Sequence, residues 1–220
     1  MDPRPAAYIS FPKSEWNPDW ELATDLTPAA WVQRVTGSEW ENFLSGQRES
    51  RSPASVVTGR VWDKYLVLPY ASIDYDKSSR RFSEYLTDEI SAAFATVFGR
   101  HSSDPDTCWA TVWDGFGDLE DRIVSFPQKV SLVGGLHEYI LSRGSLQRIQ
   151  MGGGPRGIWP IASRSPNAWW PSGHEWIVGS DIDLDAAYIG CSTSCAQELL
   201  ALGIAGLEEV SPDTPTIGEI

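Results

Sequence analysis

The clearest apolar pattern in the chain has the period of an α-helix and runs from residue 86 to residue 97. Apolar side chains recur there at helical spacing: Leu86, Ile90, Phe94 and Val97. Ser83 is a suitable cap before this pattern, and Gly99 is a suitable stop after it. We therefore expect an amphipathic helix whose apolar face packs across a sheet.

Helix signals also mark three shorter segments, at residues 27–35, 38–46 and 194–203. In the first, Thr27 is the expected cap and a proline follows at the first helical position. The second and third each have a serine followed three residues later by Glu or Gln, which is the capping-box pattern. In the third segment that serine is Ser194. A glycine marks the expected end of the second and of the third helix.

Strand patterns occupy the middle of the chain and return near its end, at residues 60–72, 107–113, 129–146 and 175–190. The segment 129–146 contains a Gly-Gly pair between two apolar runs, which is typical of a hairpin. Early helices, central strands and one closing helix predict the α+β class. We expect a mostly antiparallel sheet covered by helices on one face.

The length and composition indicate one globular domain. A chain of 220 residues with 41% hydrophobic and 21% charged residues is long enough to bury a core without disulfides or metals. We expect a single domain over residues 1–220, with a partly irregular N-terminal extension at residues 1–25 and a loose acidic C-terminal tail at residues 208–220. The turn-rich residues 47–59 are interpreted as a surface loop.

The net charge of −13 restricts the class of partner. Such a field repels phosphate groups, so we expect no nucleic-acid binding and no attachment to an anionic membrane. A basic or neutral protein partner is favoured instead. The alternative is that the carboxylates serve only solubility.

The N-terminal residues and the cysteines predict a cytoplasmic protein. The segment MDPRPAAYISFPKSEW lacks the basic region and apolar core of a signal peptide, and no apolar run is long enough for a membrane span. Cys108, Cys191 and Cys195 form no C-x-x-C pair, which fits free thiols in a reducing compartment. Two sulfurs at positions 191 and 195 do not complete a structural zinc site.

Motifs of several enzyme classes are missing from the sequence. The segment MGGGPRG lacks the Gly-Lys-Ser/Thr ending of a P-loop, and the chain has no G-x-S-x-G elbow, H-E-x-x-H pair or zinc-finger spacing. Its three histidines, His101, His137 and His174, are far apart in sequence. We therefore assign no catalytic residues, metal or cofactor, and consider an enzyme the less favoured class.

The most suggestive chemistry lies in residues 165–190, where two adjacent tryptophans and a histidine precede three aspartates at alternate positions. A strand would place all three carboxylates on one face and apolar Ile182 and Leu184 on the other. The tryptophans would form a semi-rigid loop beside that acidic face and supply contact area to a cationic partner. The predicted binding residues are Trp169, Trp170, His174, Asp181, Asp183 and Asp185.

Structural alternatives remain for the same stretch. The tryptophans are also compatible with packing at the edge of the core, and the aspartates with a solvated strand face or with binding of a hard cation. The segments SPNAWWP, DIDLDAAYIG and the following ELL helix resemble a widespread group of bacterial proteins that share an S-P-N-x-W-W-P loop followed by an acidic strand. The resemblance covers about the last third of the chain, and because that group has no established activity, it implies no catalytic residues.

Two hypotheses of function follow. The first is an acidic interaction module, of the kind that immunity proteins and antitoxins provide, which binds a basic surface of a partner protein. The second is a domain with a tryptophan-lined cleft that binds a small molecule or carbohydrate, with or without enzymatic activity.

Overall fold

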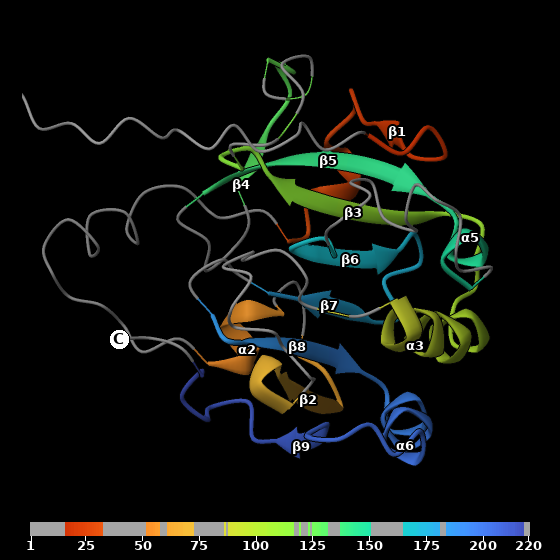
Figure 1. Cartoon of the computed structure of the whole chain (residues 1–220), viewed down its shortest axis with the longest axis vertical. Coiled ribbons are helices and arrows are strands. Elements are labelled where there is room, and N and C mark those ends of the chain that lie inside the picture. The colour runs from red at the N-terminus through yellow and green to blue at the C-terminus, as the bar shows by residue number, and fades with distance from the viewer. Residues whose placement is uncertain are drawn as a thin grey trace, which may run out of the picture.

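The chain forms a large antiparallel sheet with helices packed against it (Figure 1), giving the α+β class that the sequence predicts. The computed structural model describes residues 16–32, 52–57, 61–72, 86, 88–116, 119, 123, 125–131, 137–150, 165–180 and 184–217. Within these residues the sheet has nine strands in the order β1-β5-β3-β6-β7-β8-β2-β9, and β4 also pairs with β5. No helix in these ranges has the length and apolar character that a membrane crossing requires.

Six of the nine strands fall on the predicted strand segments, and the strands at residues 21–22, 168–171 and 208–210 lie outside them. The strands are β1 Glu21–Leu22, β2 Lys64–Pro69, β3 Cys108–Trp113, β4 Val130–Ser131, β5 Glu138–Gly144, β6 Ala168–Pro171, β7 Ile177–Gly179, β8 Ala186–Cys191 and β9 Glu208–Val210. The α-helices are α2 Pro53–Val56, α3 Asp88–Arg100, α5 Leu146–Gln150 and α6 Thr193–Ala201, and the 3₁₀ helices are η1 Thr27–Ala29 and η2 Tyr70–Ser72. The predicted hairpin is confirmed, because β4 and β5 pair antiparallel.

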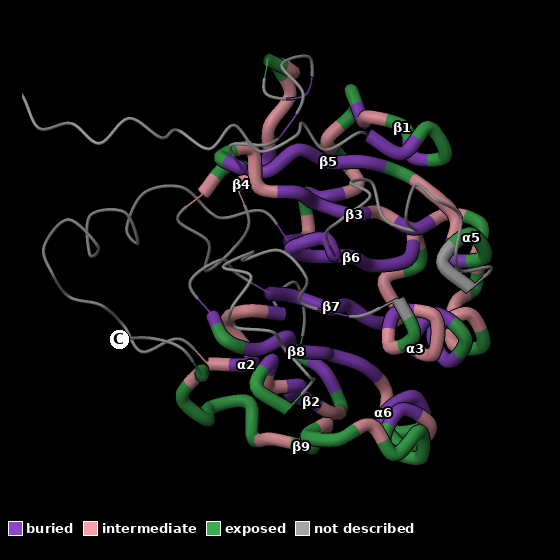
Figure 2. Tube along the Cα trace, in the orientation of Figure 1, coloured by how far each residue is buried: buried purple, intermediate pink, exposed green. Residues whose placement is uncertain are grey.

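Both faces of the sheet carry a hydrophobic core, so the prediction of helices on one face is not confirmed. On one face α3, α5 and α6 contribute buried side chains, including those of Phe94, Leu146 and Leu199. On the other face the short elements η1 and α2 contribute to a second core, with Ala29 buried and Val56 packed against it. Figure 2 shows the consequence in the central strands, where β6, β7 and β8 are buried along their length.

The helix predicted from the pattern at residues 86–97 is confirmed as α3. Phe94 and Val97 are buried in the core, and Ile90 packs against it partly buried. Leu86 is also buried but precedes the helix, which continues through Gly99 to Arg100. The apolar face therefore packs against the sheet as expected.

The shorter helices differ from the predictions at their ends. The first is a single 3₁₀ turn, and the backbone N–H of Thr27 donates to Asp25 Oδ1 at 2.9 Å. Thr27 is therefore not the cap. The N-cap of α6 is Ser192 rather than Ser194, because the hydroxyl of Ser192 accepts from the N–H of Cys195 directly after β8 ends. The predicted helix at residues 38–46 lies outside the described residues, and the predicted loop at 47–59 contains α2.

Both ends of the described chain are attached to the sheet. At the N-terminal side, the indoles of Trp16 and Trp20 are buried in the core that faces α3. At the C-terminal side, β9 pairs with β2, and the backbone N–H of Ile217 donates to the hydroxyl of Tyr188 at 2.8 Å. The tail predicted to be loose from residue 208 is thus held to the sheet as far as Ile217.

Gly190 lies in β8 next to the indole ring of Trp62. A Cβ atom at this position would stand 2.6 Å from Cγ of Trp62, well inside van der Waals contact. We therefore expect Gly190→Ala to displace this ring and to lower the free energy of unfolding by about 1–3 kcal/mol. Denaturation by urea measures the change, and a variant as stable as the wild type would contradict this packing.

Candidate functional site

The predicted aromatic loop is a strand in the middle of the sheet. Trp169 and Trp170 both belong to β6, which pairs with β3 on one side and β7 on the other. Each side chain is 0% exposed. The two indoles lie in the two different cores, because consecutive strand residues point to opposite faces. Their loop prediction is corrected to core packing, and they do not form one exposed surface.

Trp170 belongs to an aromatic cluster that also includes His174. The imidazole of His174 stacks on the indole of Trp31, with ring centroids 4.2 Å apart, and that indole meets Trp170 edge-on at 6.0 Å. Trp62 also meets Trp31 edge-on, with ring centroids 6.2 Å apart. Trp31 thus connects His174 with Trp170. Trp31 was not among the predicted site residues, because it lies far from both of them in the sequence.

His174 has the one positive φ, 59°, among the described non-glycine residues. It lies in the turn from β6 to β7, where its backbone N–H donates to the carbonyl of Pro171 at 3.0 Å. This turn directs the half-buried imidazole toward Trp31. His174 thus lies against Trp31 on the face of the sheet that carries α2.

The predicted acidic strand face is not part of β8. This strand begins at Ala186, after an exposed Asp185 whose backbone carbonyl accepts from the N–H of Tyr70. Asp181 and Asp183 lie outside the described residues. Register places Ile177, close after His174, opposite Gly190, so Asp185 and the histidine turn lie at opposite ends of β8. At about 3.4 Å per residue, roughly 17 Å separates those ends, and the two do not form one site.

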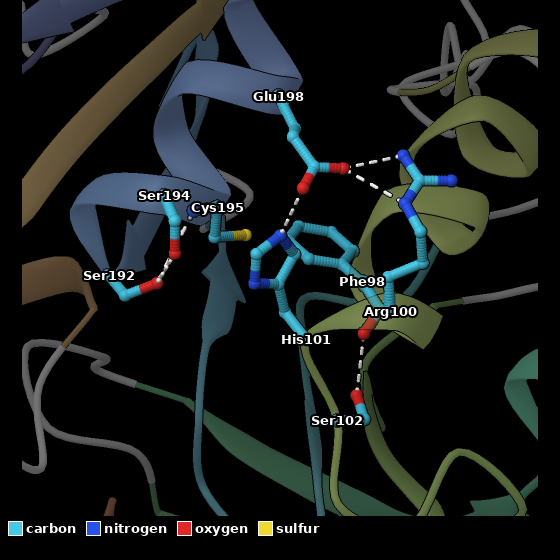
Figure 3. A network of polar contacts seen from close by, with 8 residues as sticks. All are labelled: Phe98, Arg100, His101, Ser102, Ser192, Ser194, Cys195 and Glu198. Carbon is cyan, nitrogen blue, oxygen red and sulfur yellow. Dashed lines mark hydrogen bonds and ion pairs between the residues drawn. The ribbon is translucent and has the colours of Figure 1, made fainter.

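A polar network joins the end of α3 to α6 (Figure 3). Glu198 Oε1 lies 3.0 Å from His101 Nε2, and its other oxygen accepts from Arg100 Nη2 at 2.6 Å and Nε at 2.9 Å. These hydrogen bonds, first that of Arg100 and then that of His101, hold the pKa of Glu198 below its ordinary value. Nearby, the indole N–H of Trp176 donates to Ser102, whose hydroxyl donates to the carbonyl of Phe98.

The network also contains a cysteine, which raises the question of a nucleophile. Cys195 precedes Glu198 by one turn of α6, and Figure 3 shows its sulfur on the side of the His101 ring. Among the described residues no hydrogen bond joins this thiol to His101; its side chain instead contacts that of Cys191. Cys195 is 1% exposed, which leaves no approach for a substrate. The arrangement therefore serves to hold α3 against α6.

Glu198→Gln should weaken this attachment in a way that depends on pH. A lowered pKa in the folded protein means that Glu198 contributes stability above its ordinary pKa, and that this stability is lost as pH falls through the lowered value. We expect a small loss of stability at neutral pH, because exposed ion pairs contribute little. The difference in unfolding free energy between this variant and the wild type should become smaller in acid. Urea unfolding at neutral and at acidic pH measures this difference. A difference that grows in acid would contradict the assignment.

The cysteines are free and buried, as the sequence predicts for a protein without disulfides. The thiols of Cys191 and Cys195 lie in contact, and the hydrogen bond between them, together with burial, raises the pKa of Cys191. Burial likewise raises the pKa of Cys108. No group of three or more His, Cys, Asp or Glu side chains in the described ranges is arranged to hold a metal ion. The thiols are therefore core side chains.

Among the described residues, exposed carboxylates outnumber the cations that could pair with them. Four of the five cations form ion pairs: Lys64 with Glu209 at 2.6 Å, Arg100 with Glu198 at 2.6 Å, Lys129 with Asp114 at 2.9 Å, and Arg148 with Asp19 at 3.6 Å. The fifth, Arg143, stands opposite Glu21 in the register of β1 and β5. In the same residues a larger set of exposed carboxylates has no ion-pair partner: Asp25, Asp63, Glu89, Asp106, Glu138, Asp185, Glu208 and Asp213. The described surface thus keeps an excess of negative charge.

Comparisons with known proteins find no family model, no curated protein and no solved structure that matches this chain.

Proposed function

We propose that this protein is an acidic interaction module that binds a basic surface of a partner protein, of the kind that immunity proteins and antitoxins provide. The observation that carries the proposal is a set of exposed carboxylates that have no ion-pair partner among the described residues, whereas four of the five described cations have one. The net charge of −13 agrees with this distribution. A basic partner would supply the missing counter-charges.

The physical effect of such a surface lies mainly in the rate of association. Uncompensated carboxylates attract a cationic partner over about a Debye length, so they raise the association rate more than the final affinity. The same field repels nucleic acid and anionic membranes. The proposal includes a reducing, cytoplasmic setting, in which the three thiols stay reduced.

The test is capture of the partner by the full chain from a lysate of the source organism. We expect one basic protein at stoichiometric yield, released as the salt concentration rises. The bait is compared with a variant in which exposed carboxylates are changed to amides, and that variant should recover less. The proposed function would be contradicted if no protein is recovered at stoichiometric yield. It would also be contradicted if retention of the recovered protein does not depend on the salt concentration.

A small-molecule ligand is the second candidate, supported by the half-buried stack of Trp31 and His174. Among the described residues the buried indole N–H of Trp31 has no acceptor, and a ligand oxygen that reached it would satisfy it. Carbohydrates combine an apolar face with such oxygens. Titration with a panel of mono- and disaccharides, followed by tryptophan fluorescence, tests this candidate; a saturable change that Trp31→Phe abolishes would support it, and no change would exclude that panel.

A further inference from the structure

The sheet has an open edge at β9. This strand is last in the strand order and pairs only with β2, through Tyr65 opposite Val210 and Val67 opposite Glu208. In the part of the chain that the structure describes, no backbone group bonds to the outer side of residues 208–210. Alternate residues of such a strand direct their N–H and C=O groups outward. The edge is therefore a template on which another strand can pair.

The side chains along this edge are acidic. Glu208 and Glu209 are exposed, and Asp213 follows them after the strand. Glu209 contacts Lys64, whereas Glu208 and Asp213 have no cation beside them among the described residues. The edge thus combines free backbone groups with uncompensated negative charge.

Exposed apolar side chains lie in the chain segments that precede or follow β2 and β9. The exposed large apolar residues in the described ranges are Val61, Leu200, Leu202 and Ile217. Val61, at 89% exposed, precedes β2; Leu200 and Leu202 lie at the end of α6, before β9; and Ile217 follows β9. Figure 2 shows the segments on either side of β9 as mostly exposed. Exposed apolar side chains in the chain segments next to an edge strand supply contact area that a partner can cover.

A second copy of this chain is a poor occupant of the edge. In an antiparallel pair of two β9 strands centred on Glu209, the two copies of this residue would stand opposite each other. Like charges directly opposite across a strand pair are destabilising. A strand that carries lysine or arginine would instead place opposite charges face to face.

We propose that β9 is the docking edge for an extended basic segment of the partner, which pairs with it as an additional antiparallel or parallel strand. This inference rests on the proposed function and names the part of the acidic surface that the partner uses. Backbone hydrogen bonds to β9 provide the attachment, and Glu208 and Asp213 select cationic side chains.

The experiment uses the full chain and a short synthetic peptide of alternating lysine and valine. Binding is followed by fluorescence polarisation at low salt, and hydrogen exchange is measured at the β9 amides. A second peptide has the same sequence with alternate backbone amides N-methylated, which keeps the charge and removes strand pairing. We expect the unmodified peptide to bind and to slow exchange in β9, and the methylated one to bind about tenfold more weakly.

Two charge variants locate the contact. Glu208→Gln with Asp213→Asn removes the two uncompensated carboxylates of this edge, and should weaken binding by about threefold or more. Glu21→Gln with Glu138→Gln is the matched control, since it removes the same charge from exposed sites at the other side of the sheet, where β1 and β4 pair with β5. The control should bind almost as the wild type does.

The outcomes separate this inference from the proposed function. If the methylated peptide binds as tightly, or the control variant loses as much affinity as the β9 variant, strand pairing at β9 is wrong and a general acidic surface remains. Absence of any peptide binding also overturns the β9 assignment, whereas the proposed function is judged separately by the lysate capture.

Discussion

Trp170→Ala is expected to lower the free energy of unfolding by about 3–5 kcal/mol. The indole is 0% exposed in the middle strand β6, and it packs edge-on against Trp31 at 6.0 Å. Truncation removes a large buried ring and leaves a cavity in the core. This cavity cannot close unless the sheet moves. Urea denaturation followed by circular dichroism measures the loss.

Val61→Ala is the control for this change. Its side chain is 89% exposed, so the free energy of unfolding should change by no more than about 0.5 kcal/mol. If Trp170→Ala is as stable as the wild type but releases a bound partner faster, Trp170 is a contact residue and its place in the core is wrong.

Phe94→Ala should cost a similar amount, about 3–5 kcal/mol. Phe94 is fully buried on the face of α3 that meets the sheet, and its ring contacts that of Phe98 at a centroid distance of 5.9 Å. Thermal unfolding of the variant compares it with Thr96→Ala, an exposed position on the same helix. A Phe94→Ala variant within about 0.5 kcal/mol of the wild type would mean that this face is exposed.

The sequence predicts α3 well, because one face of this helix is buried in the core and the other faces solvent. The spacing from Leu86 to Val97 reflects that difference, because the structure buries Leu86, Phe94 and Val97 and packs the partly buried Ile90 against the same core. The predicted strand segments overlap with β2, β3, β4, β5, β7 and β8 but miss β1, β6 and β9. The helix termini are less predictable, since Ser192 and Ser194 both suit a cap, and only the position where β8 ends selects Ser192.

The tryptophan pair was misinterpreted because the sheet is covered on both faces. A strand buried on both sides shows no alternation of polar and apolar residues, so Ala168–Pro171 is a short apolar run between turn residues. Flanking proline and glycine favoured a loop. The same pattern occurs in β8, where all six residues are buried, and the visible alternation of aspartates lies before that strand.

The open edge could not be located from the sequence. The charge predicts an acidic surface, but the place of β9 depends on a sheet order in which β2, from early in the chain, separates β8 from β9. A segment with Glu208 and Glu209 near the chain end instead has the composition of a loose tail. Pairing between residues far apart in sequence is what makes this short segment an edge strand.

The most direct test of the acidic interaction module is the association rate with the captured partner, measured by stopped flow at several salt concentrations. The wild-type rate should fall steeply with salt, and the Glu208→Gln, Asp213→Asn variant should start lower and show a flatter dependence. An association rate that is independent of salt, and equal in the wild type and this variant, would contradict recognition through the acidic surface.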